Sequence, residues 1–233
     1  MRLGIRTDSG RVRQNNQDAC GHRRSLYLVA DGMGGYHGGE LASRLALEAI
    51  LSAYEGLEPV SELRRGFEQA NSSIRSHAAA NAEYEGMGTT VAALVIMDDH
   101  INLAHIGDSR IYRYRSGLLT LLTRDHSLVE ELVRQGTLRA DEAKNHPQRS
   151  ILTRALGTTE SPGVEYAEVE LAKDDIFLLC TDGLTSEVED SEIGAILAEP
   201  IEPQNKADRL VDLANQKGGP DNITVIVIEN HDH

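Results

Sequence analysis

The chain has 233 residues, of which 40% are hydrophobic and 26% charged, an ordinary composition for a soluble globular protein. Its 23 basic and 37 acidic side chains give a formal net charge of −14, which argues against a nucleic-acid partner because nucleic-acid phosphates would be repelled. No apolar run approaches the roughly 20 residues needed to cross a bilayer, and the first ten residues lack the apolar core of a signal peptide. We therefore expect a cytoplasmic protein without a membrane partner.

The first third of the chain is predicted to hold one strand and two helices. The apolar residues 25–30 indicate a short buried strand that ends at Asp31. Apolar residues that recur at helical spacing predict a helix over 39–53. A second helix is predicted over 61–81, which is rich in alanine, glutamate and arginine.

The middle of the chain changes to a strand pattern. From residue 89 to residue 122, short β-branched or apolar runs alternate with turn residues, which is typical of successive antiparallel strands. A short helix is predicted near 127–135. The polar residues 136–150, which include Pro147, are predicted to form an excursion or flap.

The last third is predicted to contain three strands and two helices. The expected strands are 164–171, 176–180 and 223–228, and the expected helices are 191–198 and 203–216. Because runs of strands and runs of helices are segregated, the order favours an α+β fold over a doubly wound parallel sheet. Two packed sheets with helices outside would account for it, in one domain over residues 1–233.

Several aspartates stand beside glycine at the ends of apolar runs. Strand ends are rigid, and glycine lets the backbone approach a ligand closely, so such carboxylates can converge on one point. Mg²⁺ and Mn²⁺ prefer oxygen ligands of this kind. The candidates are Asp18, Asp31, Asp108, Asp182 and Asp221.

Each aspartate taken alone has a simpler explanation, because Asp-Gly is a common turn dipeptide. Their repetition at the ends of apolar strands favours a cation site. Several close carboxylates would also repel one another strongly without a cation to neutralise them.

Six short motifs follow one another along the chain: RQNNQD at 13–18, DGMGG at 31–35, GTT at 88–90, GDSR at 107–110, TDGL at 181–184 and GPDNIT at 219–224. In this order they resemble the metal-dependent PPM (phosphatase 2C) serine/threonine phosphatases, and bacterial members in particular. The resemblance runs from about residue 4 to residue 228. It implies a four-layer α-β-β-α sandwich with two central antiparallel sheets and a flap at about 136–150 beside the active site.

The resemblance also implies a dinuclear centre of Mn²⁺ or Mg²⁺. Asp31 resembles the carboxylate that bridges the two metals, and the carbonyl of Gly32 resembles a ligand of the second metal. Asp182 and Asp221 resemble the remaining ligands of the first metal. Asp18 resembles the residue that holds metal-bound water in the outer shell.

Two further residues take roles from the resemblance. Asp108 looks like the carboxylate that, with Asp182, holds a third metal in bacterial relatives. Arg13 resembles the arginine that binds the phosphate, and its planar fork suits two phosphate oxygens. The implied reaction is hydrolysis of phosphoserine and phosphothreonine in proteins by a metal-activated water, without a phosphoenzyme.

Two positions depart from the family pattern. Many relatives have a histidine, the proposed general acid, where this chain has Met33, and methionine has no proton to donate. Gln17 replaces a glutamate that is common in eukaryotic relatives. We therefore expect a metal-bound water to protonate the leaving oxygen, with His37 and His126 as alternative donors.

The expected partners are phosphorylated proteins, including a serine/threonine kinase that the enzyme opposes in bacterial signalling, and the chain is expected to be a monomer. A catalytically silent phosphoprotein-binding module on the same fold is one alternative. A metal-dependent hydrolase of small phosphate esters or nucleotides is the other. The sequence names neither the substrate protein nor the physiological metal.

Overall fold

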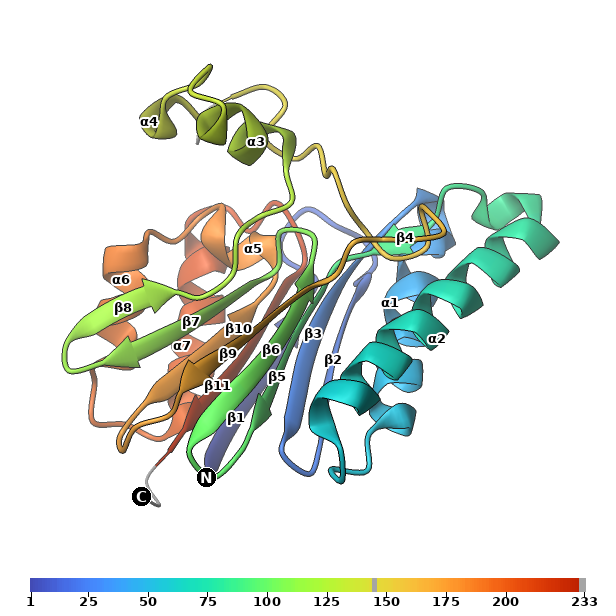
Figure 1. Ribbon diagram of the computed structural model, residues 1–233. Coiled ribbons are helices and arrows are strands. Elements are labelled where there is room, and N and C mark those ends of the chain that lie inside the picture. The colour runs from blue at the N-terminus through green and yellow to red at the C-terminus, as the bar shows by residue number, and fades with distance from the viewer. Residues whose placement is uncertain (144–145, 231–233) are drawn as a thin grey trace.

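Two antiparallel β-sheets lie face to face at the centre of the structure, and helices cover the outer face of each (Figure 1). The computed structural model describes residues 1–143 and 146–230. Its four layers confirm the predicted α+β sandwich with two central antiparallel sheets.

The first sheet has five strands in the order β1-β11-β10-β7-β8. β11 therefore lies between the first strand of the chain and β10, with Asp8 of β1 opposite Ile223 of β11. The strands are β1 (Arg2–Asp8), β11 (Ile223–Glu229), β10 (Ile176–Cys180), β7 (Arg110–Arg115) and β8 (Leu118–Leu121).

The second sheet follows the order β2-β3-β5-β6-β9, and the short β4 pairs with the end of β3. All of these pairings are antiparallel. The strands are β2 (Asp18–Arg23), β3 (Leu26–Met33), β4 (Gly88–Thr89), β5 (Val91–Ile96), β6 (His100–Ile106) and β9 (Glu165–Glu170).

The helices divide into an outer layer on each sheet and a projecting pair. α1 (Gly35–Ala53) and α2 (Pro59–Ala80) cover the second sheet, and a 3-10 turn follows at Ala82–Tyr84. The first sheet is covered by α5 (Asp182–Thr185), α6 (Asp190–Leu197) and α7 (Pro203–Gln216). α3 (Leu128–Arg134) and α4 (Ala140–Ala143) stand away from the layers (Figure 1).

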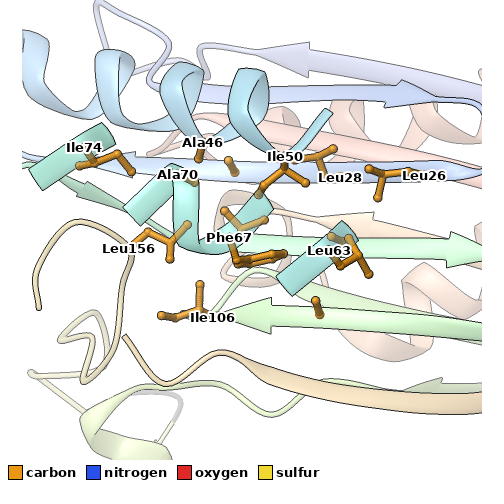
Figure 2. Close-up of a cluster of buried hydrophobic side chains, with 14 of the residues drawn as sticks. Leu26, Leu28, Ala46, Ile50, Leu63, Phe67, Ala70, Ile74, Ile106 and Leu156 are labelled. Atoms are coloured by element: carbon orange, nitrogen blue, oxygen red, sulfur yellow. The ribbon is translucent and has the colours of Figure 1, made fainter. Parts of the chain in front are cut away.

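Apolar side chains fill each interface between layers. Between the sheets, fully buried residues such as Val29, Phe177 and Ile226 alternate with residues that face the helices. Between α1, α2 and the second sheet, Figure 2 shows Ile50 and Phe67 packed with the strand residue Leu28. The helical spacing that predicted α1 is thus the spacing of core residues.

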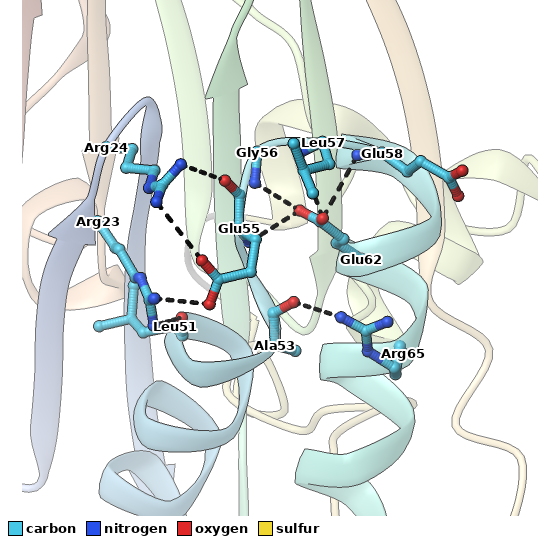
Figure 3. Close-up of polar contacts among 10 residues, drawn as sticks. All are labelled: Arg23, Arg24, Leu51, Ala53, Glu55, Gly56, Leu57, Glu58, Glu62 and Arg65. Carbon is cyan, nitrogen blue, oxygen red and sulfur yellow. Dashed lines mark hydrogen bonds and ion pairs between the residues drawn. The ribbon is translucent and has the colours of Figure 1, made fainter.

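A carboxylate closes the turn between α1 and α2. The buried side chain of Glu62 accepts backbone N–H groups of Glu55, Gly56, Leu57 and Glu58 at 2.7–3.3 Å (Figure 3). Burial alone would raise the pKa of Glu62, but the four backbone hydrogen bonds outweigh it and leave the pKa below its usual value. These bonds satisfy the backbone N–H groups of the turn that leads into α2.

Most predicted elements lie within a few residues of those in the structure, and the largest difference in bounds is near the glycine-rich motif. β3 continues through Asp31 to Met33 and does not end at Asp31, because β4 pairs with its last residues. α1 begins at Gly35 and not at residue 39. β1 and β2 were not predicted. No helix in the described part of the chain is both long enough and apolar enough to span a membrane.

The projecting segment, which we define as residues 127–152, begins and ends at a bridge between Ser127 and Leu152. It contains α3 and α4 and stands above the end of the sandwich where α5 and β4 lie (Figure 1). The predicted flap at 136–150 lies within it, and its residues 144 and 145 lie outside the described residues.

Candidate metal centre

Both sheets bring aspartates to the same end of the sandwich. Asp18 opens β2 and lies directly across from Asp31 in β3. Asp182 follows β10 as the first residue of α5, and Asp221 lies just before β11. Asp108 lies in the tight turn between β6 and β7, so five segments that are distant in sequence contribute one carboxylate each.

The carboxylates are close enough to perturb one another. Burial raises the pKa of Asp31 well above its usual range, and the charges of Asp18, Asp182, Asp108 and Asp221 raise it further. The five predicted carboxylates therefore form one electrostatic group. They carry far more negative charge than a half-buried site holds readily without a cation or protons.

Three of the other aspartates respond in the same direction. Burial, followed by the charge of Asp221, raises the pKa of Asp182, although a hydrogen bond with the Asp31 carboxyl opposes this shift. Burial and the charge of Asp182 raise the pKa of Asp108. Burial raises the pKa of Asp18 to about 7, in spite of hydrogen bonds that lower it.

Asp18 has one satisfied and one unsatisfied oxygen. Its Oδ2 accepts hydrogen bonds from the hydroxyls of Thr181 at 2.9 Å and Thr224 at 2.7 Å. Its Oδ1 is buried and has no hydrogen-bond partner among the described atoms. A buried carboxylate oxygen left in this state is costly unless a cation or an ordered water completes it. The donor set therefore fits a hydrated divalent cation.

Arg13 lies at the edge of this group. Its Nη2 donates to Asp221 Oδ2 at 2.8 Å, and a hydrogen bond and the charge of Asp221 raise the pKa of Arg13. About half of the Arg13 side chain is exposed, at 55%. The guanidinium is thus fixed at the site while most of its donors face outward.

Asn222 holds the segment that carries Arg13. Its Oδ1 accepts the backbone N–H of Gln17 at 2.8 Å, and its Nδ2 donates to the carbonyls of Ser9 and Asn15 at 3.1 and 2.9 Å. One amide side chain thereby ties residues 9–17 to the start of β11. The position of Arg13 therefore depends on the side-chain amide of Asn222, although that amide makes no hydrogen bond to the aspartates.

Hydrogen bonds and close packing also fix the backbone of Asp31 and Gly32. Asp31 N–H donates to the Thr90 hydroxyl at 3.0 Å, and the Asp31 carbonyl accepts from the Thr89 hydroxyl at 2.8 Å. A Cβ on Gly32 would lie 2.0 Å from the carbonyl oxygen of Gly39, so only glycine fits between β3 and α1. The predicted ligand pair therefore lies on rigid backbone.

A bidentate ion pair lies behind Asp108. Arg110 donates from Nε and Nη2 to the two carboxylate oxygens of Asp125 at 2.9 and 2.7 Å. The Arg110 guanidinium lowers the pKa of Asp108 and Asp182, whereas the Asp125 carboxylate raises both. At Asp108 the effect of Asp125 is the larger, so the pair adds no net positive charge beside this predicted ligand.

The three residues considered for proton donation are placed differently. Met33 pairs with Gly88 of β4, and its methyl group packs against that glycine. His37 lies on the exposed first turn of α1. His126 is buried: its Nδ1 accepts the Gly107 N–H at 3.1 Å, and its Nε2 lies 3.1 Å from Glu165 Oε1. Both ring nitrogens of His126 are therefore engaged away from a substrate.

A separate group of potential ligand atoms lies outside the aspartates. Atoms of His105, His126 and Glu165 all lie within 4.8 Å of one another. None of the three was predicted as a ligand.

The structure also shows supporting residues that the sequence argument missed. Thr181, Thr224 and Asn222 hold Asp18 and the Arg13 segment in place. Thr181 and Asn222 stand directly beside Asp182 and Asp221, and Thr224 is the last residue of the GPDNIT motif. Their small polar side chains within these two motifs were the available signal.

Comparison with known proteins adds an independent line of evidence. A family model for protein phosphatase 2C matches residues 8–215. A serine/threonine phosphatase stp of Listeria monocytogenes is 37% identical over 241 residues, which cover 98% of this chain and 96% of that protein. The serine/threonine protein phosphatase PstP of Mycobacterium tuberculosis is 40% identical over 238 residues, covering all of this chain and 46% of PstP.

Solved structures agree with these sequence matches. The crystal structure of Mycobacterium tuberculosis PstP superposes with a TM-score of 0.94 at 38% identity, covering 99% of each chain. The catalytic domain of PstP in complex with two manganese ions superposes with a TM-score of 0.91 at 37% identity, covering 99% of this chain and 98% of that one.

Proposed function

The chain belongs to the protein phosphatase 2C family and is a protein serine/threonine phosphatase, and from this premise we propose that its aspartate group binds the divalent cations needed for hydrolysis. The core ligands in this proposal are Asp31, the Gly32 carbonyl, Asp182 and Asp221, with Asp18 behind them and Asp108 as the ligand of a third ion. Two observations carry it: the charges of four other aspartates act on the Asp31 carboxyl, and Asp18 has a buried oxygen without a hydrogen-bond partner among the described atoms.

The cations in this proposal are Mn²⁺ or Mg²⁺, because the ligands are all oxygen atoms. Two of these cations occupy the core site. When bound, they would lower the pKa of a coordinated water and offset the charge of the phosphate. The manganese complex of PstP supports this choice by analogy.

Arg13 binds the phosphate in this proposal. Its contact with Asp221 fixes one edge of the guanidinium, and the remaining N–H donors can grip two phosphate oxygens. The phosphorus is thereby held in line with the attacking water. The Arg13–Asp221 pair also links the phosphate to a predicted metal ligand.

The reaction is a direct hydrolysis. The water oxygen attacks phosphorus, the bond from phosphorus to the serine or threonine oxygen breaks, and that oxygen takes a proton. The hydroxyls nearest the carboxylates, Thr181 and Thr224, donate to Asp18 and are not placed as nucleophiles. Met33 has no proton to donate, His126 is engaged elsewhere and His37 lies on the exposed first turn of α1, so water supplies the proton in this proposal.

The substrate class and setting extend the proposal. Phosphorylated proteins, including a serine/threonine kinase that the enzyme opposes, are the partners, and the chain acts as a cytoplasmic monomer in bacterial signalling. Residues 1–233 act as one domain, with the flap at about 136–150 beside the phosphoprotein. The relatives named serine/threonine phosphatases support the substrate class.

The test is turnover of a phosphothreonine peptide by chelator-treated protein, before and after addition of Mn²⁺ or Mg²⁺. Turnover should require the cation and should fall by at least about a thousandfold in Asp182→Ala, because removal of a metal ligand disables the water as nucleophile. Asp98→Ala, which removes an exposed turn carboxylate, is the matched control. Metal-independent turnover would contradict the proposal.

A rapid-quench experiment addresses the absence of a phosphoenzyme. Direct attack by water predicts no radiolabelled enzyme after acid quenching at any time during turnover of a radiolabelled phosphopeptide. Label bound to the enzyme in proportion to its concentration, which then disappears as phosphate is released, would show a covalent intermediate and overturn this step.

A further inference from the structure

Glu165, the first residue of β9, lies outside the aspartate group and joins two distant parts of the chain. Its Oε1 lies 3.1 Å from His126 Nε2 and 3.1 Å from Arg154 Nη1. His105 stacks on His126 with ring centroids 4.8 Å apart, and it also lies directly across from Glu165 in the sheet. The cluster therefore combines two imidazoles, one carboxylate and one guanidinium.

The hydrogen bonds argue against a metal in this cluster. A backbone N–H can only donate, so His126 Nδ1, which meets Gly107 N–H at 3.1 Å, must accept. The neutral ring then carries its proton on Nε2, which faces Glu165. A cation at Nε2 would have to displace that proton and leave an imidazolate, next to the positive charge of Arg154. Burial and the neighbouring His105 lower the pKa of His126, in keeping with the neutral ring.

The same hydrogen bonds place Glu165 at both ends of the projecting segment. His126 precedes the segment and Arg154 follows it, and Thr153 N–H donates to the His126 carbonyl at 2.8 Å. Arg154 Nη1 also donates to the carbonyl of Gly163 at 3.3 Å. One carboxylate on a strand of the sandwich thus holds the base of a segment that otherwise stands clear of it (Figure 1).

His126 also grips the turn that carries Asp108. Its backbone N–H donates to the Gly107 carbonyl at 2.9 Å, while its ring accepts from the Gly107 N–H. Gly107 has a φ of 96°, a conformation that favours glycine and makes the turn sensitive to its neighbours. The orientation of the projecting segment is therefore linked to the edge of the candidate metal centre.

We propose that Glu165 is a positioning residue of the phosphatase, which anchors the projecting segment in the orientation that receives a phosphoprotein. The inference rests on the proposed function, because it needs a substrate at the aspartate group. Glu165 makes no contact with the reacting atoms. It acts by holding His126 and Arg154, and thereby both ends of the segment, against the sandwich.

The test compares two substrates in the manganese-loaded enzyme. Glu165→Ala should raise the KM of a phosphothreonine peptide by about five- to tenfold, as expected for loss of a charged hydrogen bond, and leave kcat for a small aryl phosphate within about twofold. Glu165→Gln should restore the peptide KM, because its amide oxygen can still accept from His126. Glu168→Ala, at an exposed position on the same strand, is the matched control.

A second variant and a structural measurement separate anchoring from a general loss of stability. His126→Asn keeps an acceptor for Gly107 N–H but loses the contact with Glu165, so combining it with Glu165→Ala should add less than about twofold to the KM. Backbone hydrogen exchange should accelerate at Gly107 and Thr153 in Glu165→Ala, with the melting temperature of the sandwich unchanged.

Three results would overturn the proposal. Equal losses of kcat for both substrates, with KM unchanged, would place the effect on the chemistry and not on the projecting segment. An unchanged peptide KM in Glu165→Ala would show that no anchor exists. Binding of Mn²⁺ or Zn²⁺ that survives Asp182→Ala but disappears in His126→Asn would make the cluster a metal site. Manganese-dependent turnover of the phosphothreonine peptide by the parent enzyme in the same assay shows in each case that the proposed function itself stands.

Discussion

Asp182→Asn should stabilise the metal-free protein and at the same time abolish its stabilisation by Mn²⁺. Asp182 is half-buried beside Asp221 and close enough to Asp31 for a hydrogen bond between the carboxyls. Two unit charges about 4 Å apart repel by about 4 kcal/mol at an effective dielectric constant of about 20. Partial protonation and the lost interaction with the start of α5 reduce the gain, and about 2 kcal/mol is expected to remain.

The gain should depend on pH in a defined direction. A carboxyl whose pKa is raised on folding costs nothing below its unfolded pKa near 4, where it is neutral in both states. The cost appears as the pH rises and is complete above the raised pKa. The advantage of Asp182→Asn should therefore be absent at about pH 4 and largest near pH 8.

Thermal melts of chelator-treated protein measure both effects. For a chain of this size, about 2 kcal/mol corresponds to a rise of about 4–8 °C in Tm. Mn²⁺ at about 100 times its Kd should stabilise the parent by about 2.7 kcal/mol and the variant hardly at all. Asp98→Asn, at an exposed turn, should change neither value. A lower metal-free Tm for Asp182→Asn at pH 8, or equal stabilisation of both proteins by Mn²⁺, would refute the reasoning.

Three further substitutions test separate features. Arg13→Lys should lower kcat/KM for a phosphopeptide by about 10- to 100-fold at unchanged Tm, because an ammonium cannot reproduce the bidentate fork, as steady-state kinetics would show. Glu62→Gln should destabilise the protein by about 1–2 kcal/mol at pH 7 but not at pH 3, as melts at both pH values would show. The lowered pKa of Glu62 stabilises the fold above about pH 4, and this stabilisation is lost on acidification. Gly32→Ala should cost at least about 3 kcal/mol in chemical denaturation, since its Cβ would lie 2.0 Å from the Gly39 carbonyl oxygen.

The control for Gly32→Ala is a second glycine of the same chain. Gly86→Ala introduces a methyl group where nothing lies within 4 Å, so its cost should be limited to the left-handed backbone, about 1–2 kcal/mol. A similarly small loss of stability in Gly32→Ala would mean that α1 can move away from β3 at little cost in free energy. An Arg13→Lys enzyme with full kcat/KM, or a Glu62→Gln effect that persists at pH 3, would remove the corresponding argument.

The sequence predicted most helices and strands because the apolar positions along each element are the positions that it buries in the core. α7 and β10 have the predicted bounds, since each buries one continuous face or run. β1 and β2 were missed because they carry few apolar residues and lie at sheet edges. The partner of β1 is β11, at the far end of the chain, and local patterning does not encode such a pairing.

The candidate site was predicted from the ordered motifs more than from residue spacing. The aspartates alone were also explained by turns, and Asp31 in fact lies inside a strand that β4 prolongs. The roles of Asn222 and Glu165 depend on contacts between residues that are far apart in sequence. A single sequence holds no record of such contacts, so these roles required the fold.

The central place of β11 has a consequence for how the enzyme comes into being. This last strand separates β1 from β10, so the first sheet has a gap until residues 223–229 have emerged from the ribosome. Asp221 and Asn222, which complete the carboxylate group and hold the Arg13 segment, arrive with the same strand. Because such distant pairing forms late in folding, a nascent chain lacks the complete carboxylate group. Under the proposed function, we therefore expect activity only after β11 is in place.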